Sequence, residues 1–303
     1  MIDNKFVDLY ARNSGLRDKL VAERDVVLTY ALRAMVDAQV MEQLAFKGGT
    51  CLRKMIFGSA GRFSEDLDFT LATGRPEDDV LVELVEVLNR EHYGIAFTFD
   101  EYYKTEGDTS FGGDVFYRHA WNDSGHFRLQ VSLRERPTLP VVSRALQHQA
   151  YFDHLEFDLF KVPSLLAIEM IAEKVRAAFQ RVKVRDLYDL HRFATTPFNG
   201  ELLRRLVVLK LWQTRDPFDP EAFFVKLRGG TYDWDDVRRL VRTTEQIEPT
   251  DIIEVVEKRF AMFNQLTELE QQVIVDAKSG WNEPLADRLR AEIYDIATEG
   301  GVI

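Results

Sequence analysis

The segment from residue 44 to residue 71 constrains the fold most, because its hydrophobic pattern changes twice within a short distance. A short apolar run at residues 44–46 ends at Lys47-Gly48-Gly49-Thr50, and residues 51–57 then follow a helical pattern. From Asp66 to Ala72, polar and apolar residues alternate, which is typical of a half-buried strand. A strand, a glycine turn, a helix and a second strand in succession predict a mixed α/β domain.

The remaining segments predict two domains. Helical spacing is found in residues 1–40 and 77–91, whereas β-branched and aromatic residues predict antiparallel strands at 95–99, 114–121 and 126–134. From Pro163 onward helices dominate, and we expect them at 163–180, 184–194, 200–213, 219–227, 233–243, 249–276 and 283–297. We therefore expect a mixed α/β domain over residues 1–155 and an all-helical domain over residues 156–303.

Composition narrows the class of protein. No run of about 18 apolar residues is present, so we expect no membrane-spanning helix. Cys51 is the only cysteine, which excludes a disulfide framework and a thiolate zinc site within one chain. The first residues lack the basic and apolar segments of a signal peptide, and a reducing compartment suits the single thiol. We therefore expect a cytoplasmic protein.

Charge is distributed unevenly along the chain. The net charge is −11, which argues against sequence-blind binding of nucleic acid over the whole surface. Between Lys174 and Arg192, however, six Lys or Arg residues stand against two acids. This basic zone is either a bounded polyanion site or an ordinary solvated helix face.

Two aspartates share one face of the strand predicted after residue 63. Side chains alternate along a strand, so Ser64, Asp66 and Asp68 lie on one face, and Leu67 and Phe69 lie on the other. Adjacent carboxylates repel each other unless a cation lies between them. Two carboxylates, with substrate phosphates and water, form the ligand set that Mg²⁺ prefers. The alternative is an exposed polar strand face without a ligand.

The glycine turn strengthens the metal hypothesis. Gly48 and Gly49 let backbone N–H groups approach a phosphate closely, and Thr50 can cap the following helix or bind the phosphate. The turn is not a Walker loop, because Lys47 precedes the glycines. A phosphate-binding turn beside a metal-binding strand predicts phosphoryl or nucleotidyl transfer.

The run at residues 46–54, followed by residues 62–69, resembles the AbiEii family of bacterial toxins, which includes the MenT toxins of mycobacteria. A later run, comprising residues 173–177, Arg181 and residues 185–190, resembles the helical-domain motif of that family. The resemblance implies a polymerase-β-like nucleotidyltransferase domain followed by a helical domain. It also implies a toxin that transfers a nucleoside monophosphate from a nucleoside triphosphate (NTP) to the 3′ end of transfer RNA, blocks translation and has a neighbouring antitoxin.

The combined interpretation assigns roles to named residues. Asp66 and Asp68 are expected to hold magnesium. The triphosphate is expected to be bound by Lys47, Gly48, Gly49, Thr50 and Ser64. Two alternatives stay open at this point: transfer to a protein hydroxyl, and a catalytically inactive relative that binds nucleotide or protein. Polymerase-β-like enzymes often carry a third carboxylate on a later strand, and residues 127–134 contain none.

Lys174 falls in the middle of the apolar face of the helix predicted at 163–180. A lysine there is costly unless it meets negative charge, which a bound phosphate would supply, or unless its head reaches water. The family motif places an active-site lysine at this position. We therefore expect Lys174→Ala to lower transfer activity while leaving thermal stability unchanged or higher.

The helix predicted at 184–194 carries a further candidate for an active-site carboxylate. The resemblance favours Asp189 over Asp186 as the active-site residue, the alternative being an ion pair between Asp189 and its neighbouring arginines. Arg181, Lys183 and Arg185 are candidate RNA contacts within the basic zone.

Overall fold

The computed structural model describes residues 2–105, 107 and 109–303. The chain divides into two compact units. The sheet unit comprises Met1–Pro137, Val141–Leu165 and Arg238–Glu245, and the helical unit comprises Thr138–Pro140, Leu166–Val237 and Gln246–Ile303. This division differs from the boundary expected at residue 155, because residues 156–165 and 238–245 lie with the sheet.

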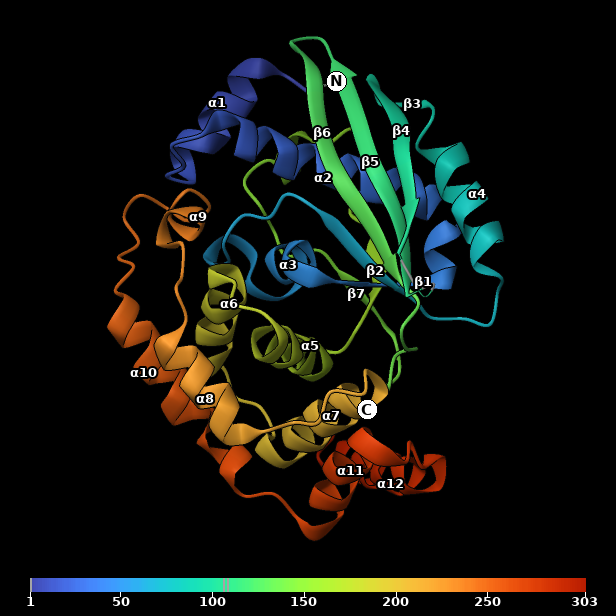
Figure 1. Ribbon diagram of the computed structural model, residues 1–303. Coiled ribbons are helices and arrows are strands. Elements are labelled where there is room, and N and C mark those ends of the chain that lie inside the picture. The colour runs from blue at the N-terminus through green and yellow to red at the C-terminus, as the bar shows by residue number, and fades with distance from the viewer. Residues whose placement is uncertain (1, 106, 108) are drawn as a thin grey trace. The chain divides into compact units, whose positions relative to one another are not determined.

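An eight-stranded mixed sheet forms the sheet unit, with the order β3-β4-β5-β6-β2-β1-β8-β7 (Figure 1). The strands are β1 Leu44–Lys47, β2 Leu67–Leu71, β3 Glu91–His92, β4 Ile95–Lys104, β5 Ser110–His119, β6 Asn122–Ser132, β7 Val142–Ala145 and β8 Lys161–Ser164. The pairs β2–β6 and β1–β8 are parallel, and the other neighbours are antiparallel.

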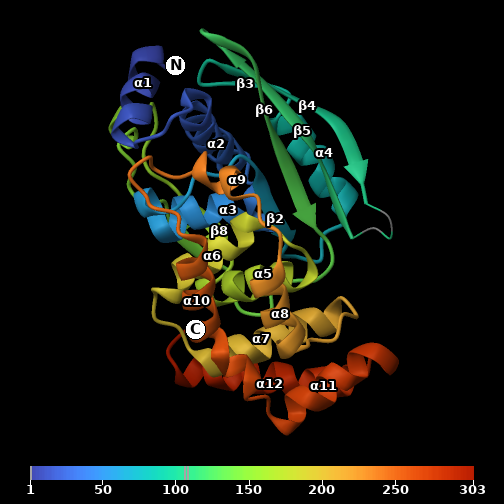
Figure 2. The ribbon, with the colours of Figure 1, turned by 60° about the vertical axis from the view of Figure 1, so that its left-hand side comes forward.

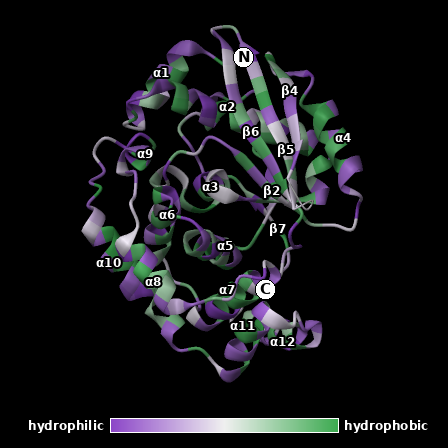
Figure 3. Cartoon of the chain, viewed as in Figure 1, coloured by the Kyte–Doolittle hydropathy of each residue, from purple (hydrophilic) through white to green (hydrophobic). Residues whose placement is uncertain are grey.

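Alternation along the strands separates a buried face of the sheet from an open one. In Figure 3, hydrophobic and hydrophilic residues alternate along β4, β5 and β6. Leu67 and Phe69 of β2 and Leu129 and Val131 of β6 are fully buried or nearly so, whereas Asp68 is half-buried. The predicted alternation is therefore confirmed for Leu67, Asp68 and Phe69, whereas Ser64 and Asp66 precede β2.

Four helices belong to the sheet unit: α1 Asn4–Asn13, α2 Lys19–Asp37, α3 Gly48–Cys51 and α4 Glu77–Val87. Most of α2 is buried, and it contacts β6 and α4. Helix α3 continues as a π-helical stretch, Leu52–Phe57. The order predicted for this part of the chain, from the N-terminal helices through β1, the turn and β2, is therefore confirmed.

The helical unit contains α5 Ala167–Gln180, α6 Val184–Ala194, α7 Gly200–Gln213, α8 Pro220–Gly229, α9 Trp234–Arg238, α10 Pro249–Phe260, α11 Glu268–Ser279 and α12 Glu283–Glu299. Helix α7 is buried along most of its length, and α5, α11 and α12 pack against it. Figure 2 shows α11 and α12 beside α7. In the described part of the chain, no helix is long and apolar enough to cross a membrane.

Several predicted boundaries are wrong. The helix predicted from residue 163 begins at Ala167, because residues 161–164 form β8, and the helix predicted at 233–243 ends at Arg238. The single helix predicted at 249–276 is two helices, separated by a 3₁₀ turn. Helix α11 starts at a capping box, in which Thr267 and Glu270 satisfy each other's backbone N–H groups.

Candidate active site

The glycine turn lies directly against the carboxylate face of β2. Gly48 has a φ of +77°, a conformation that favours glycine, and a Cβ placed on it would overlap with Oδ2 of Asp68. A Cβ on Gly49 would lie 2.7 Å from Nη2 of Arg62 and 2.8 Å from Oγ of Ser64. Gly48 is therefore required sterically, whereas a larger residue at position 49 would require the Arg62 and Ser64 side chains to move.

Thr50 holds the helix against the strand. Its side chain is buried, and its hydroxyl donates a hydrogen bond to the backbone carbonyl of Asp66. Lys47 occupies the N-cap position of α3 without a side-chain cap. Thr50 therefore does not cap the helix, which was one of the two roles predicted for it, because its hydroxyl binds the segment that carries the aspartates.

Strand register places Lys47 beside the carboxylates. In the antiparallel pair β1–β2, Lys47 stands opposite Asp68, so their side chains lie on the same face of the sheet. Asp66 immediately precedes β2 and is half-buried, as Asp68 is. A cationic side chain, the Asp68 carboxylate and a glycine turn therefore meet at the edge where β1 passes into α3, and Asp66 immediately precedes the same strand.

The neighbouring strand supplies an amide instead of a third carboxylate. In the parallel pair β2–β6, Asp68 stands opposite Gln130, whose Nε2 donates to Oγ of Ser110 at 2.9 Å. Among residues 2–105, 107 and 109–303, no group of three or more His, Cys, Asp or Glu side chains is placed to hold a metal ion. A metal at this site would therefore take at most two carboxylates from the protein.

Glu65 was not singled out by sequence, but it fixes the segment that carries the site. Its carboxylate lies 2.8 Å from Nη1 of Arg24 and 2.7 Å from Nη2 of Arg239, and its side chain is only 14% exposed. Arg239 comes from residues 238–245, where the carbonyl of Leu240 also accepts a hydrogen bond from the N–H of Phe63 at 2.7 Å. Ser64 and Asp66, on either side of Glu65, are therefore anchored from two directions.

Two further basic residues of the N-terminal motif are structural. The Lys54 ammonium is fully buried and lies 3.0 Å from Oδ1 of Asp25, with the hydroxyls of Thr29 and Tyr151 at 2.9 and 3.2 Å. Burial raises the pKa of Asp25, but Lys54 and Arg53 outweigh this effect and lower it. Lys54 therefore braces the π-helical stretch after α3 against α2 and is not available to a phosphate.

The candidate residues of the helical unit form a closed cluster. Nζ of Lys174 lies 2.9 Å from Oδ1 of Asp186 and 2.9 Å from Oδ2 of Asp189, whose side chains are 2% and 3% exposed. Burial raises the pKa of Asp186, but Lys174 and then Arg181 outweigh it, so that the pKa falls to about 2. The view of Lys174 as a cation in need of an external partner is therefore wrong, because the protein itself supplies two carboxylates.

The basic zone carries less unbalanced charge than its sequence suggests. Arg181 pairs with Asp186 at 2.8 Å, and Arg185 forms two hydrogen bonds, of 2.6 and 2.7 Å, to Asp236. Lys183 is exposed and makes no ion pair with any residue that the structure describes. The count along the sequence missed Asp236, which lies far from Arg185 in the chain.

Comparison with known proteins now decides the family. The sequence profile of the nucleotidyl transferase AbiEii toxins of type IV toxin–antitoxin systems matches residues 30–294. The chain belongs to the AbiEii family. No curated protein sequence matches it.

Two solved structures are similar to this AbiEii-family protein. MenT4, a nucleotidyltransferase toxin from Mycobacterium tuberculosis H37Rv, superposes with a TM-score of 0.81 at 25% identity, covering 97% of this chain and 99% of MenT4. JHP933 from Helicobacter pylori is a more distant match, with a TM-score of 0.43 at 18% identity over 92% of this chain and 97% of that protein. The likeness to MenT4 supports the mixed α/β fold with its eight-stranded sheet.

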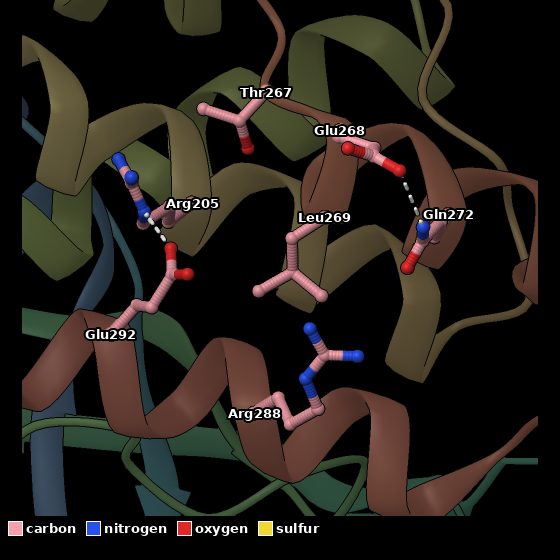
Figure 4. A pocket seen from close by; sticks show the side chains of 7 residues that line it. All are labelled: Arg205, Thr267, Glu268, Leu269, Gln272, Arg288 and Glu292. Atoms are coloured by element: carbon pink, nitrogen blue, oxygen red, sulfur yellow. Dashed lines mark hydrogen bonds and ion pairs between the residues drawn. The ribbon is translucent and has the colours of Figure 1, made fainter.

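A pocket of about 370 Å³ in the helical unit of this AbiEii-family protein lies apart from the predicted residues (Figure 4). It is lined by Arg205, Thr267, Glu268, Leu269, Gln272, Arg288 and Glu292. Arg205 is held by Glu292 at 2.8 Å, and Gln272 by Glu268 at 3.3 Å. Since charges of both signs line this pocket and several are already paired, it offers no concentrated charge to a nucleotide.

Proposed function

We propose that this protein transfers a nucleoside monophosphate from an NTP to an acceptor, in a reaction that depends on Mg²⁺ held by Asp66 and Asp68. The observation that carries the proposal is the fit between turn and strand: only a residue without a side chain can stand at Gly48 against the Asp68 carboxylate. Membership of a nucleotidyltransferase toxin family supports the same activity.

The residues at the site fit magnesium. Asp66 and Asp68 are half-buried oxygen donors on one side of the strand, and two carboxylates completed by substrate phosphates and water are typical of Mg²⁺ sites. When bound, Mg²⁺ would neutralise charge on the phosphates and activate the attacking hydroxyl. The lack of a Cβ at Gly48 lets the Asp68 carboxylate lie directly against the turn.

The turn and its neighbours would bind the triphosphate. Backbone N–H groups of Gly48 and Gly49 donate to phosphate oxygens, and the Ser64 hydroxyl, which lies beside Gly49, adds a further hydrogen bond. Lys47 contributes positive charge on the same face, while Thr50 keeps the turn in register with the strand. In the transfer, the acceptor oxygen bonds to the α-phosphorus, the bond to the bridging oxygen breaks, pyrophosphate leaves, and the hydroxyl proton passes to solvent.

The helical unit would contribute Lys174. We assign its ammonium to stabilising the triphosphate, since the Lys174 side chain is 13% exposed whereas that of Lys54 is fully buried, and we assign Asp186 and Asp189, both at 2.9 Å, to holding the ammonium in place. Both aspartates pair with Lys174, so the preference for Asp189 over Asp186 rests on the family motif alone.

The acceptor we propose is the 3′ end of transfer RNA, whose modification would block translation, and the partner we propose is a cognate antitoxin. The type IV toxin–antitoxin description of the family supports the antitoxin, and the acceptor rests on the resemblance of the sequence motifs to the AbiEii family. Arg181, Lys183 and Arg185 remain candidate RNA contacts, and Lys183 is the best of them because it makes no ion pair among the described residues.

Labelled NTPs, incubated with the protein, Mg²⁺ and total cellular RNA and protein, test this proposal. We expect the label to enter transfer RNA with the wild-type protein and with Asp123→Asn, a control at an exposed carboxylate of β6, but not with Asp68→Asn. Label in protein would identify a protein hydroxyl as the acceptor. Absence of transfer to either class would mark the chain as an inactive relative.

A further inference from the structure

A row of four residues crosses the open face of the sheet beside the candidate metal site. Asp68 of β2 stands opposite Gln130 of β6, Gln130 opposite Gly112 of β5, and Gly112 opposite Tyr103 of β4. Adjacent strands lie about 4.8 Å apart, so the row extends from the carboxylates in steps of that length. We call Gln130, Gly112 and Tyr103 the platform row.

Tyr103 leans over the glycine of this row. A Cβ on Gly112 would lie 3.0 Å from the Tyr103 hydroxyl, so the ring occupies space that a side chain at position 112 would fill. The register of β4 slips between Asp100 and Tyr103, where Glu101 has a φ of +50°, and such a bulge re-aims the side chains that follow it. The bulge and the glycine together direct the Tyr103 ring toward β6.

The polar atoms of the platform row leave capacity for a ligand. Gln130 uses its Nε2 on Ser110, which leaves its Oε1 available as an acceptor, and the described residues offer the Tyr103 hydroxyl no hydrogen bond. Burial and the carboxylates of Asp68, Asp114 and Asp66 raise the pKa of Tyr103 against the opposing effect of Arg128, so the hydroxyl stays a donor.

Arg128 adds an exposed cation next to the platform row. It lies two residues before Gln130 on the same face of β6, its side chain is 60% exposed, and its only partner among the described residues is Asp114, at 3.8 Å. An ion pair this long and this exposed is weak, so the guanidinium can turn to a phosphate at little cost.

The order of the strands assigns this side of the site to the acceptor. In nucleotidyl transfer, the attacking oxygen and the leaving pyrophosphate lie in line on opposite sides of the α-phosphorus. The turn at Gly48 and Gly49 follows β1, on one side of β2, whereas the platform row lies on β6, β5 and β4, on the other side. If pyrophosphate leaves from the turn, the acceptor approaches over the platform row.

We propose that the platform row and Arg128 bind the terminal nucleotide of a nucleic-acid acceptor. This inference rests on the proposed nucleotidyl transfer. The Tyr103 ring stacks on the terminal base above Gly112, Oε1 of Gln130 accepts a hydrogen bond from a ribose hydroxyl, and Arg128 pairs with the adjoining phosphate. An aromatic ring beside an exposed guanidinium is the usual means of holding single-stranded nucleic acid.

The test measures binding and transfer with purified transfer RNA as the probe. Tyr103→Leu, which keeps an apolar side chain without a ring, should raise both the Kd and the KM for transfer RNA about tenfold, while the KM for the NTP changes less than twofold. Tyr103→Phe keeps the stacking surface and should stay within about threefold of wild type. Arg128→Ala should reduce the salt dependence of binding by about one phosphate contact. Arg118→Ala, a control at an exposed arginine further along β5, should change neither the Kd for transfer RNA nor the salt dependence of binding.

The outcomes are separable from those of the proposed function. Binding of transfer RNA is measured without turnover. If neither the wild type nor any variant transfers the nucleotide, the proposed function is overturned, but the effect of Tyr103→Leu on the Kd can still be measured. A rise in the KM for the NTP alone would assign the platform row to the donor nucleotide and overturn the inference. Wild-type binding and KM in Tyr103→Leu, with an unchanged melting temperature, would overturn it as well.

Discussion

The two units each carry a pair of aspartates, and the pairs differ in how deeply they are buried. Asp66 and Asp68 are half-buried at and beside the start of a strand, with a glycine turn directly against Asp68. Asp186 and Asp189 lie on α6 with almost no exposure, and both reach Lys174 at 2.9 Å. The first pair is the more exposed one, to which we assign the metal ion, whereas the second pair is folded around a cation of the protein itself.

The difference shows that burial distinguishes two acidic motifs that look alike in the sequence. Buried carboxylates are tolerated only with a partner in place, so the Lys174 cluster must form when the helical unit folds. Carboxylates that remain accessible can instead exchange their partner during a reaction cycle. Variants that alter one pair or its surroundings test this difference.

The largest effect is expected from removing the internal cation. Lys174→Ala leaves two buried carboxylates without their ammonium, so we expect the free energy of unfolding to fall by about 3 kcal/mol. This reverses the expectation from sequence that stability would be unchanged or higher. Urea unfolding measures the effect, and Lys183→Ala, at an exposed lysine, serves as the control. Equal stability of Lys174→Ala and wild type would show that the cluster does not hold the helical unit together.

Gly48→Ala tests how tightly the first pair is built. The new Cβ would collide with the Asp68 carboxylate and would require a positive φ, so we expect transfer to fall by about 10- to 100-fold. Gly301→Ala is the matched control, because Gly301 has a φ of +64° with no atom near its missing Cβ. If the two variants lose the same activity, backbone strain explains the loss and contact with Asp68 does not.

Acid should reduce the contribution of Asp186 to the free energy of unfolding over a defined pH range. The pKa of Asp186 is about 2, below its ordinary value of 3.8, so its carboxylate stabilises the fold above about pH 4. That contribution, about 2 kcal/mol, is lost as pH falls from about 4 to about 2. The difference in free energy of unfolding between wild type and Asp186→Asn should therefore shrink over this range. A difference that does not vary with pH would contradict the charge pairing.

The smallest effect is expected at Glu65. Glu65→Gln weakens the contacts to Arg24 and Arg239, which are partly exposed, so stability should fall by only about 1 kcal/mol. Because Glu65 lies between Ser64 and Asp66, the KM for the NTP should rise a few-fold while kcat changes less. Arg239→Gln, which removes one of the two contacts, should give an intermediate KM. A change in stability with no change in KM would confine Glu65 to a structural role.

The sequence was most informative where neighbours in the chain are also neighbours in space. Alternation placed Asp66 and Asp68 opposite Leu67 and Phe69, and the glycines after the first strand marked the turn. Strands β7 and β8 were missed, because four-residue strands carry little periodicity and Pro163 suggested the start of a helix. The break between α10 and α11 had a signal, the Thr267 and Glu270 capping box, inside a pattern that otherwise continued as a helix.

Partners distant in the chain could not be predicted from sequence. Helical periodicity placed Lys174 on an apolar face, but only the packing of α5 on α6 brings Asp186 and Asp189 to its ammonium. Arg239 is likewise brought to Glu65 by the return of residues 238–245 to the sheet unit. Such contacts depend on how helices and strands pack against one another, which cannot be predicted from a single sequence.

Titration with Mn²⁺ tests most directly whether only the first pair receives an external cation. Mn²⁺ accepts the same oxygen ligands as Mg²⁺, and its binding in the presence of a non-hydrolysable NTP analogue can be followed by electron paramagnetic resonance. We expect one site in the wild-type protein, the same site in folded Asp186→Asn, and at least tenfold weaker binding in Asp68→Asn. Wild-type Mn²⁺ affinity in Asp68→Asn, or its loss in folded Asp186→Asn, would contradict the account.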